Sequence, residues 1–239
     1  MSGEDTKTEF FPHGIYLESA DKFNEFLELL QEDSDNEITS LMIDGNLLSD
    51  SFFVNRLQKS GVCESLNLVV RELVSSSMIS LMANQNDKIK IEFIKAFEEK
   101  LNAAQKLGCT KIIHSFNLVC QDEAVTDLLK TMYGICYKKQ IVFELSLRIP
   151  QIDREQSFTD VHAQIRKLML QIGLVLDIHV DENAFMQMDF AEEIRPLIFD
   201  ISAVHFFYES KFGNRLAADT VNNVVSACSN FDLPLEFFV

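Results

Sequence analysis

Four side chains of the kinds that bind metal ions stand near the ends of four apolar, strand-like runs in the second half of the chain. They are Glu144, Asp177, His205 and Glu236. The clearest run covers residues 174–179, where an uncharged stretch leads into Asp177 and His179. Side chains of a strand alternate between its two faces, so these two residues point the same way. Whether the four runs form one site depends on the fold that positions them.

Three carboxylates and one imidazole make an oxygen-rich ligand set. Such a set suits Mn²⁺, Mg²⁺ or Co²⁺, and Zn²⁺ is also compatible with it. Without a cation, three carboxylates that point into one site repel one another and are costly to remove from water. A lone Glu or His at a strand end is more often an ordinary rim or core residue. The prediction of a divalent-metal site therefore rests on the four residues occurring together.

Eight apolar runs of strand length alternate with amphipathic, helix-like runs. The expected strands are residues 14–17, 40–43, 66–70, 111–114, 141–145, 174–179, 201–206 and 233–238. This order predicts an α/β fold, a single-domain (β/α)8 TIM barrel that lacks the last helix, in which all C-terminal strand ends share one face. An open doubly wound sheet is the alternative, although no Gly-rich phosphate loop follows the first strand.

The domain boundaries follow from the same pattern. We expect a loosely ordered, polar tail over residues 1–9 and the barrel over residues 10–239. Amphipathic spacing predicts helices that include residues 49–59, 93–104, 123–138, 159–171 and 217–229. The longest interval between strands, 44 residues from Leu68 to Ile112, predicts an additional polar loop over residues 74–86, at the C-terminal end of strand three. That segment is either a lid over the functional face or an insertion without a function.

The composition narrows the function classes. A net charge of −16 disfavours nucleic acids and anionic membrane surfaces as partners, but is compatible with divalent cations and small substrates. The five cysteines are odd in number and form no CxxC pair, which favours reduced thiols in a cytoplasmic protein. No apolar run approaches the roughly 20 residues of a membrane span. The polar start, residues 1–9, does not look like a secretory signal.

The order of the four ligands, with Glu, Asp, His and Glu on strands five to eight, resembles the xylose isomerase-like TIM barrel superfamily. That superfamily includes sugar isomerases, keto-sugar epimerases, inosose dehydratases and an apurinic endonuclease branch. Residues 103–114 also resemble its third helix, glycine cap, fourth strand and terminal His. The chain looks like a divergent and shortened member.

The resemblance implies a divalent-metal-dependent isomerase or epimerase of a small sugar or polyol, an enzyme of carbohydrate metabolism. Glu144 and Glu236 would be the acid/base pair that moves a proton through an enediolate, and Asp177 and His205 would complete the metal site. The residues implied to bind substrate oxygens are His114, His179, Arg148 and Lys211.

Departures from the family pattern leave other functions open. Strand six carries Asp177 and His179 two positions apart, where the family commonly has Asp-x-x-His. Residues 208–215 resemble a loop of the endonuclease branch, but its Asp-x-His zinc pair does not follow, and the acidic charge also argues against a DNA enzyme. The remaining alternatives are a metal-dependent dehydratase or lyase, and a catalytically inactive barrel that acts as a binding or structural protein.

The last expected strand, residues 233–238, indicates how copies of the chain would associate. If Glu236 points inward, then Leu235, Phe237 and Val239 point outward in an apolar strip with no expected helix over it. Soluble monomers rarely expose such strips. The sequence therefore predicts a homodimer, most simply a two-fold one, that buries the strip.

Overall fold

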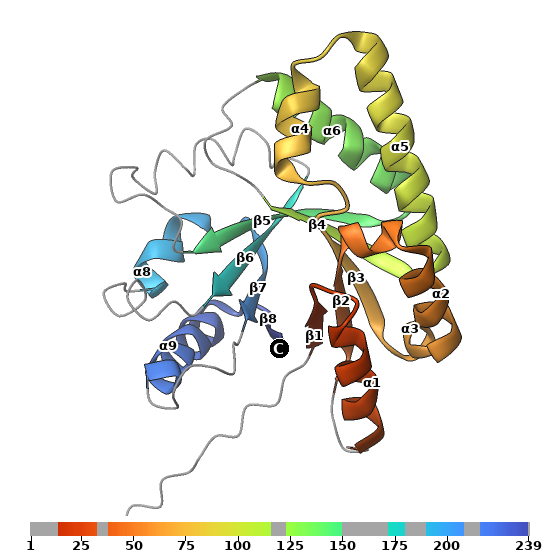
Figure 1. Ribbon diagram of the computed structural model, residues 1–239. Coiled ribbons are helices and arrows are strands. Elements are labelled where there is room, and N and C mark those ends of the chain that lie inside the picture. Colours follow the sequence, from red (N-terminus) through yellow and green to blue (C-terminus); the bar gives the residue numbers. More distant parts are fainter. Residues whose placement is uncertain are drawn as a thin grey trace, which may run out of the picture.

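The computed structural model describes residues 14–32, 38–115, 123–149, 172–179, 190–207 and 216–238. Each strand pairs in parallel with the next one, and the last pairs with the first, so the sheet closes into a barrel (Figure 1). The strands are β1 (Gly14–Leu17), β2 (Ser40–Asp44), β3 (Asn67–Arg71), β4 (Cys109–Ser115), β5 (Val142–Ile149), β6 (Gly173–His179), β7 (Ile201–Phe207) and β8 (Leu235–Phe238). The predicted TIM barrel is confirmed.

Helices connect the strands and cover the outside of the barrel (Figure 1). The described ones are α1 (Lys22–Glu32), α2 (Ser51–Ser60), α3 (Val62–Ser65), α4 (Ser76–Ala83), α5 (Asp87–Lys106), α6 (Glu123–Lys138), α8 (Phe190–Ile194) and α9 (Leu216–Phe231), with the 3₁₀ turns η1 (Gly45–Ser49) and η3 (Arg195–Leu197). None of the helices in the described ranges is long and apolar enough to cross a membrane.

Capping residues fix where these helices begin and end. The Asp50 carboxylate accepts from the backbone N–H groups of Phe52 and Phe53 and starts α2. Gly61, with φ at 72°, ends it in the left-handed conformation that glycine adopts without strain. The Asn86 side chain accepts from the Ile89 N–H, at 3.2 Å, and starts α5.

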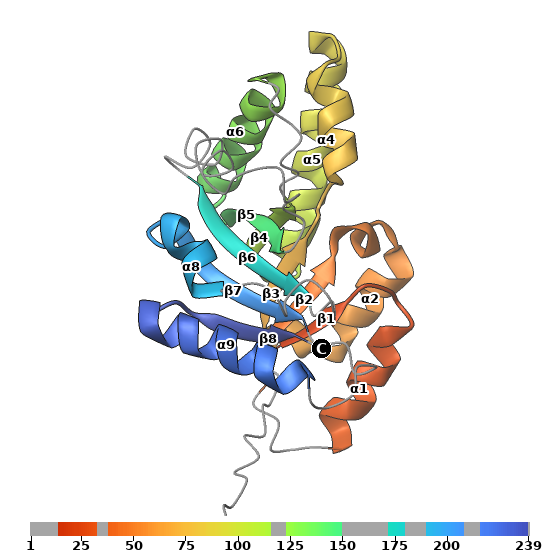
Figure 2. The ribbon, with the colours of Figure 1, turned by 90° about the vertical axis from the view of Figure 1, so that its left-hand side faces the viewer.

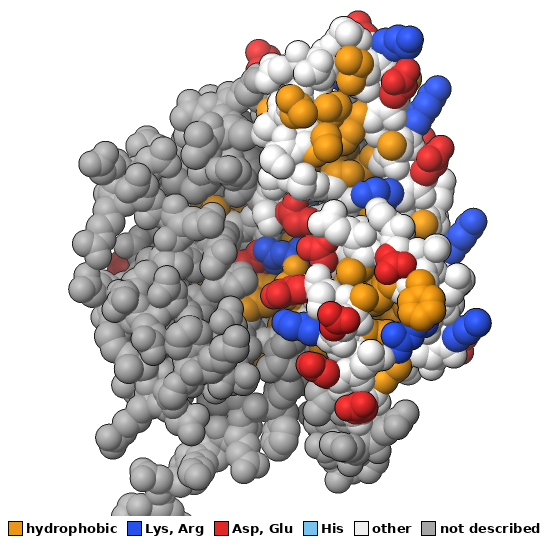
Figure 3. Space-filling view, viewed as in Figure 1, with side chains coloured by type: hydrophobic (Ala, Val, Ile, Leu, Met, Phe, Trp, Pro, Cys, Tyr) orange, Lys and Arg blue, Asp and Glu red, His pale blue; other side chains and the backbone are white. Residues whose placement is uncertain are grey.

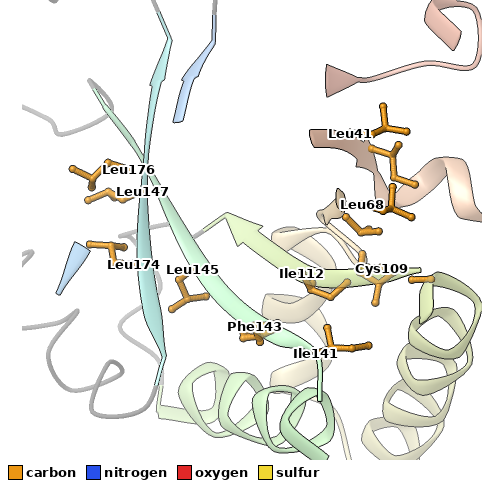
Figure 4. Packing of buried hydrophobic residues seen from close by; sticks show 14 of the residues in the cluster. Leu41, Leu68, Cys109, Ile112, Ile141, Phe143, Leu145, Leu147, Leu174 and Leu176 are labelled. Carbon is orange, nitrogen blue, oxygen red and sulfur yellow. The ribbon is translucent and has the colours of Figure 1, made fainter. Parts of the chain in front are cut away.

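The strands separate two apolar layers. One face of each strand belongs to the large apolar cluster shared with the helices. Figure 4 shows Leu145 and Leu147 of β5 and Leu174 and Leu176 of β6 among the residues of this cluster. The other face fills the barrel interior with a smaller cluster, Met42, Val69, Ile113, Val175, Phe207 and Phe238, with Tyr16 against it. This alternation decides which polar residues face the interior.

Two expectations about the elements are wrong. Strand five does not end near Leu145 but runs to Ile149. The segment after strand three is not a polar loop, because residues 76–83 form α4, with Ser75 as its N-cap. Hydrophobic side chains gather over α4 and α5 (Figure 3), where Met78, Leu81 and Ile91 are exposed. The expected tail, residues 1–9, and the expected helix over residues 159–171 lie outside the described residues.

The join between β8 and β1 closes the barrel. Among the residues that the structure describes, these strands share one register pair, Gly14 with Phe238. The Phe238 ring lies so close that a Cβ on Gly14 would be 2.5 Å from it. Figure 2 shows α1 and α9 on the two sides of this join, with the end of the chain between them. Glycine at position 14 therefore makes room for the ring that fills the interior.

Candidate functional site

Three of the four predicted ligands lie in one register row across β6, β7 and β8. Asp177 pairs with His205, and His205 pairs with Glu236. His205 Nδ1 is 3.6 Å from Asp177 Oδ1, and His205 Nε2 is 3.9 Å from Glu236 Oε2. Asp177 and His205 are buried, while the Glu236 side chain is 36% exposed. We call these three residues the 177–205–236 row.

An arginine that sequence reasoning did not single out reaches this row from the other side of the barrel. Arg71 ends β3, and its Nη2 donates to Asp177 Oδ2 at 2.5 Å. The same nitrogen lies 3.3 Å from Ser115 Oγ on β4 and 3.4 Å from Ser146 Oγ on β5. Its guanidinium carbon is 5.3 Å from the centre of the Phe207 ring on β7. The barrel interior thus contains a cation from the protein itself.

The ion pair between Arg71 and Asp177 decides the charge of both groups. Burial alone would raise the pKa of Asp177, but the neighbouring His205 and Arg71 outweigh it and hold that pKa well below its usual range. Burial alone would lower the pKa of Arg71, but the charge of Asp177 and the hydrogen bond to it raise that pKa instead. Both groups are therefore ionised at neutral pH and compensate each other.

Glu144 lies apart from the row. It is in register with Gly173, four residues before Asp177, which corresponds to about 13 Å along the strand. Its carboxylate forms an ion pair with Lys111 on β4, at 3.0 Å. Because β5 continues to Ile149, the residue in register with Asp177 is Arg148 and not Glu144. The predicted fourth ligand is therefore partnered elsewhere in the barrel.

Of the four predicted substrate-binding residues, the backbone register places Arg148 beside Asp177 and His179 two residues after it, whereas His114 faces away from the row. His114 follows Ile113, which faces the interior, so it faces the helix layer, where its Nδ1 is 3.4 Å from Glu72 Oε2. Burial lowers the pKa of His114, so this imidazole is neutral at pH 7. His179 is in register with Phe207. The side chains of His179 and Arg148, and all of Lys211, lie outside the described part of the chain.

Arg71 and Lys111 compensate the negative charge of the two buried carboxylates. The sequence predicted that inward carboxylates need a cation, and each of the two buried ones, Asp177 and Glu144, has a basic side chain of the protein as its partner. A signal for Arg71 was present, because it ends the apolar run of strand three just as Asp177 follows that of strand six. The sequence-based prediction counted only acidic residues and histidines as site residues, and it therefore missed Arg71.

The residues around the row do not fit the predicted four-ligand metal centre. The described residues contain no group of three or more His, Cys, Asp or Glu side chains arranged to hold a metal ion. The donor chemistry gives the reason, because Arg71 already occupies one oxygen of Asp177 and Lys111 already pairs with Glu144. The prediction of Mn²⁺, Mg²⁺, Co²⁺ or Zn²⁺ as a cofactor stays a prediction.

Several buried polar atoms at the row lack a hydrogen-bond partner among the described residues. Within the described ranges, Arg71 Nη1, Asp177 Oδ1 and both ring nitrogens of His205 have no hydrogen-bond partner. A buried polar group without a partner costs about 1–3 kcal/mol. These atoms include both donors and acceptors. Hydroxyl groups, which donate and accept, are their natural complement.

No protein family and no curated protein matches the sequence. Solved structures do match the fold over nearly the whole chain. D-psicose 3-epimerase from Clostridium cellulolyticum, solved with D-tagatose, is 11% identical, with a TM-score of 0.63 over 95% of this chain and 84% of that one. A sugar phosphate isomerase/epimerase from Parabacteroides distasonis is 13% identical, with a TM-score of 0.61 over 94% of this chain and 89% of that one.

A third similar structure is 3-keto-D-glucoside 4-epimerase from E. coli, which is 14% identical, with a TM-score of 0.57 over 95% of this chain and 90% of that one. Proteins described as having a xylose isomerase domain match as well, with TM-scores of 0.58 and 0.60. At these identities the likeness establishes the fold. The resemblance to xylose isomerase-like barrels is confirmed at that level.

Proposed function

We propose that this chain is a sugar isomerase/epimerase-like barrel that binds a small sugar or polyol at the 177–205–236 row without a divalent metal. The observation that carries the proposal is the buried Arg71–Asp177 ion pair, which supplies a cation and leaves polar atoms without partners beside it. The fold supports the ligand class, because the similar solved structures are named as sugar epimerases and isomerases.

The chemistry of the row suits a polyhydroxylated ligand. Arg71 Nη1 is a donor, Asp177 Oδ1 is an acceptor, and the imidazole of His205 offers one of each when it is neutral. Glu236 stands at the exposed end of the row, where it can accept from a hydroxyl group. Vicinal hydroxyls satisfy such a mixed set, whereas an apolar ligand would leave every one of these atoms unpaired.

This proposal selects one of the functions that the sequence left open, the catalytically inactive binding barrel. The metal-dependent isomerase, and the dehydratase or lyase on the same fold, both require Glu144 and Glu236 beside one cation. In the described arrangement Glu144 is bound to Lys111. The acid/base pair implied by the resemblance is therefore not assembled around the row.

Calorimetric titration with free ketoses, polyols and their phosphorylated counterparts tests the proposal, with and without EDTA. We expect binding by at least one compound, unchanged by EDTA, and at least tenfold weaker binding in Glu236→Ala. The control is Glu92→Ala, which removes the same charge from an exposed position on α5. Binding that needs added metal, or no binding across the panel, would count against the proposal.

A second candidate is proton transfer at the same row, that is, an active isomerase or epimerase. It is favoured by one observation, the position of the His205 imidazole between the Asp177 and Glu236 carboxylates. An imidazole next to a partly exposed carboxylate is a plausible acid/base pair for a carbon acid. Proton NMR in D₂O separates the candidates, because an isomerase or epimerase exchanges the hydrogen beside the ketose carbonyl and a binding protein leaves it in place.

A further inference from the structure

We infer that Glu72 and Gly45 are positioning residues. They maintain a strained turn of the backbone that keeps Arg71 on Asp177, and they thereby set the affinity of the 177–205–236 row for its ligand. Neither residue is joined to the row by a contact between described residues. The claim about ligand affinity rests on the proposed function, whereas the claim about the ion pair can be tested without any sugar.

Glu72, the residue after Arg71, adopts a strained backbone conformation. Its φ angle is 52°, in the left-handed region that residues with a Cβ atom rarely adopt. The two other such residues in the described ranges, Gln140 and Asp232, come after the last turns of α6 and α9, where a left-handed residue commonly ends a helix. Glu72 instead follows a strand, so helix termination does not account for it. Strain of this kind persists where the surrounding structure enforces it, often at binding sites.

Strand β4 enforces the turn through both the backbone and the side chain of Glu72. The Glu72 N–H donates to the Ile113 carbonyl oxygen at 2.9 Å, and its Oε1 accepts from the Ser115 N–H. Its Oε2 lies 3.4 Å from His114 Nδ1. The Glu72 carboxylate is therefore held in the helix layer beside His114, while the preceding side chain, that of Arg71, extends into the barrel interior.

Glycine at position 45 allows the chain after β2 to pack directly on this turn. A Cβ atom at Gly45 would overlap with the Glu72 carbonyl oxygen and with Leu73 Cα. These are backbone atoms, which cannot swing aside as the end of a flexible side chain can, so a larger residue at position 45 must displace the turn. Gly45 and Leu73 are both buried, and the turn is thus enclosed between β4 and η1.

The position of the turn decides whether Arg71 reaches Asp177. Nη2 of Arg71 bonds to the carboxylate at 2.5 Å, and Nη1 has no hydrogen-bond partner among the described residues. Arginine–carboxylate pairs frequently form two parallel bonds, so this single bond holds the guanidinium less firmly. Ser115 Oγ and Ser146 Oγ lie 3.3 Å and 3.4 Å from Nη2, which is long for a hydrogen bond. The ion pair therefore depends on where the end of β3 is held.

A displaced Arg71 would change the row in two ways. Asp177, which is completely buried, would keep only His205 as a basic neighbour among the described residues. The unpartnered donor Arg71 Nη1 would also move away from the unpartnered acceptor Asp177 Oδ1. Binding groups must be held within about 0.5 Å of their working geometry. Both changes weaken the binding of a polyhydroxylated ligand, although positions 45 and 72 do not touch it.

A double-mutant cycle measured by urea unfolding tests the effect on the ion pair. In the wild-type background, Asp177→Asn leaves Arg71 unpaired and is strongly destabilising. In Gly45→Ala the pair is already broken, so Asp177→Asn should shift the urea midpoint less than about half as far. A merely structural role of Gly45 would give equal shifts in the two backgrounds, because independent sites contribute additively.

Calorimetric titration with D-tagatose and sorbitol, one ketose and one polyol, tests the effect on the ligand. Gly45→Ala and Glu72→Ala should bind about tenfold more weakly than wild type, or weaker still. Glu72→Gln keeps an acceptor for the Ser115 N–H and should restore most of the affinity. The control is Gly134→Ala on α6, where an added Cβ meets no atom within 4 Å, and it should bind like wild type.

The outcomes separate this inference from the proposed function. Glu72→Ala takes the place of Gly45→Ala in the cycle if the latter does not fold. The inference is overturned if Asp177→Asn shifts the urea midpoint equally in every background, or if Glu72→Ala binds the probes as tightly as wild type does. If the cycle shows the expected coupling but wild type binds neither probe nor any other compound of the panel, the positioning role stands and the proposed function fails.

Discussion

Asp177 lies in the barrel interior between two basic side chains, with Arg71 on one oxygen and His205 beside the other. Its presence could be predicted from an apolar run that ends in a carboxylate. Its ion pair with Arg71 could not be predicted, because strand parity says which residues face inward and not how far a long side chain reaches. Arg71 crosses two strands to form the pair, which no local pattern in residues 66–71 reveals.

Removal of the Asp177 charge is expected to be costly and to depend on pH. Because the pKa of Asp177 is lowered in the folded state, its stabilisation is present above the unfolded-state pKa, about 4, and is lost as the pH falls further. Asp177→Asn should lower the free energy of unfolding by about 3–5 kcal/mol at pH 7, since Arg71 is left unpaired. Urea unfolding between pH 7 and pH 2.5 should show this difference shrinking below pH 4. A constant difference would contradict the ion pair.

His114 gives a second pH signature, in a different range. Burial lowers its pKa, so the folded state favours the neutral imidazole, and stability is full above the unfolded-state pKa of about 6.5 and declines as the pH falls below it. Urea unfolding of wild type should therefore lose stability between pH 7 and pH 5, by at most about 1.4 kcal/mol per pH unit. His114→Gln should lack this decline. Equal slopes for both proteins would show that another group titrates there.

At the scale of the elements, most of the strands were predictable because each is an apolar run between helix-like segments. The end of β5 was not recognised, although Leu145, Leu147 and Ile149 alternate with Ser146 and Arg148 in the period of a half-buried strand. The polar residues between the apolar ones interrupt the apolar run, so this alternation was not recognised as part of the strand. Because β5 runs four residues further than expected, Arg148 and not Glu144 is in register with Asp177. The unrecognised end of β5 is thus the reason why Glu144 was wrongly grouped with the three residues of the row.

The segment after β3 is fixed to the barrel mouth by several described contacts. Glu72 accepts from the Ser115 N–H and lies beside His114, and Ser76 Oγ donates to the Ser115 carbonyl oxygen at 2.9 Å. Lys100 of α5 reaches the Leu73 carbonyl oxygen at 3.4 Å. These bonds tie α4 to the ends of β3 and β4. Of the two predicted roles, they favour a fixed insertion over a lid.

The start of α5 offers a direct check on this part of the fold. Asn86→Ala removes the side-chain acceptor for the Ile89 N–H and should lower the free energy of unfolding by about 1 kcal/mol. Asn86→Asp keeps the acceptor and places a negative charge at the helix N-terminus, so it should be neutral or slightly stabilising. Denaturant titrations of the three proteins measure both effects. Equal losses in the two variants would mean that the cap contributes nothing.

At the scale of the whole molecule, the outside of β8 lies beside a groove that α9 leaves open. A groove of about 470 Å³ lies there, lined by Val225, Cys228, Ser229, Asp232, Leu233, Leu235 and Phe237. The expected outward strip is partly covered within the chain, since Phe237 is 9% exposed and Leu235 is half-buried. The sequence pattern placed Leu235 and Phe237 of this strip correctly, while Val239 lies outside the described residues. The pattern could not show how much of the strip α9 covers.

We predict that a second copy of the chain packs against this groove, giving a homodimer. Light scattering at micromolar concentration should report twice the monomer mass, and Leu235→Asp should return the molecule to a monomer because a charge in an apolar interface is costly to bury. The exposed Phe199 provides a control, since Phe199→Asp also exchanges an apolar residue for a charge but lies outside the groove. A monomeric wild type would refute the prediction.

The closure between β8 and β1 has a consequence for misfolding. Within the described residues, those strands share the single pair Gly14 and Phe238, whereas other neighbouring strands share four to six register pairs. Mild heat or denaturant should therefore break the pairing between β8 and β1 first. This would open the barrel into a curled sheet with two unpaired edge strands. Unpaired edges recruit strands from other chains. Aggregation of this protein would then begin at the opened junction between β8 and β1, before the rest of the barrel unfolds.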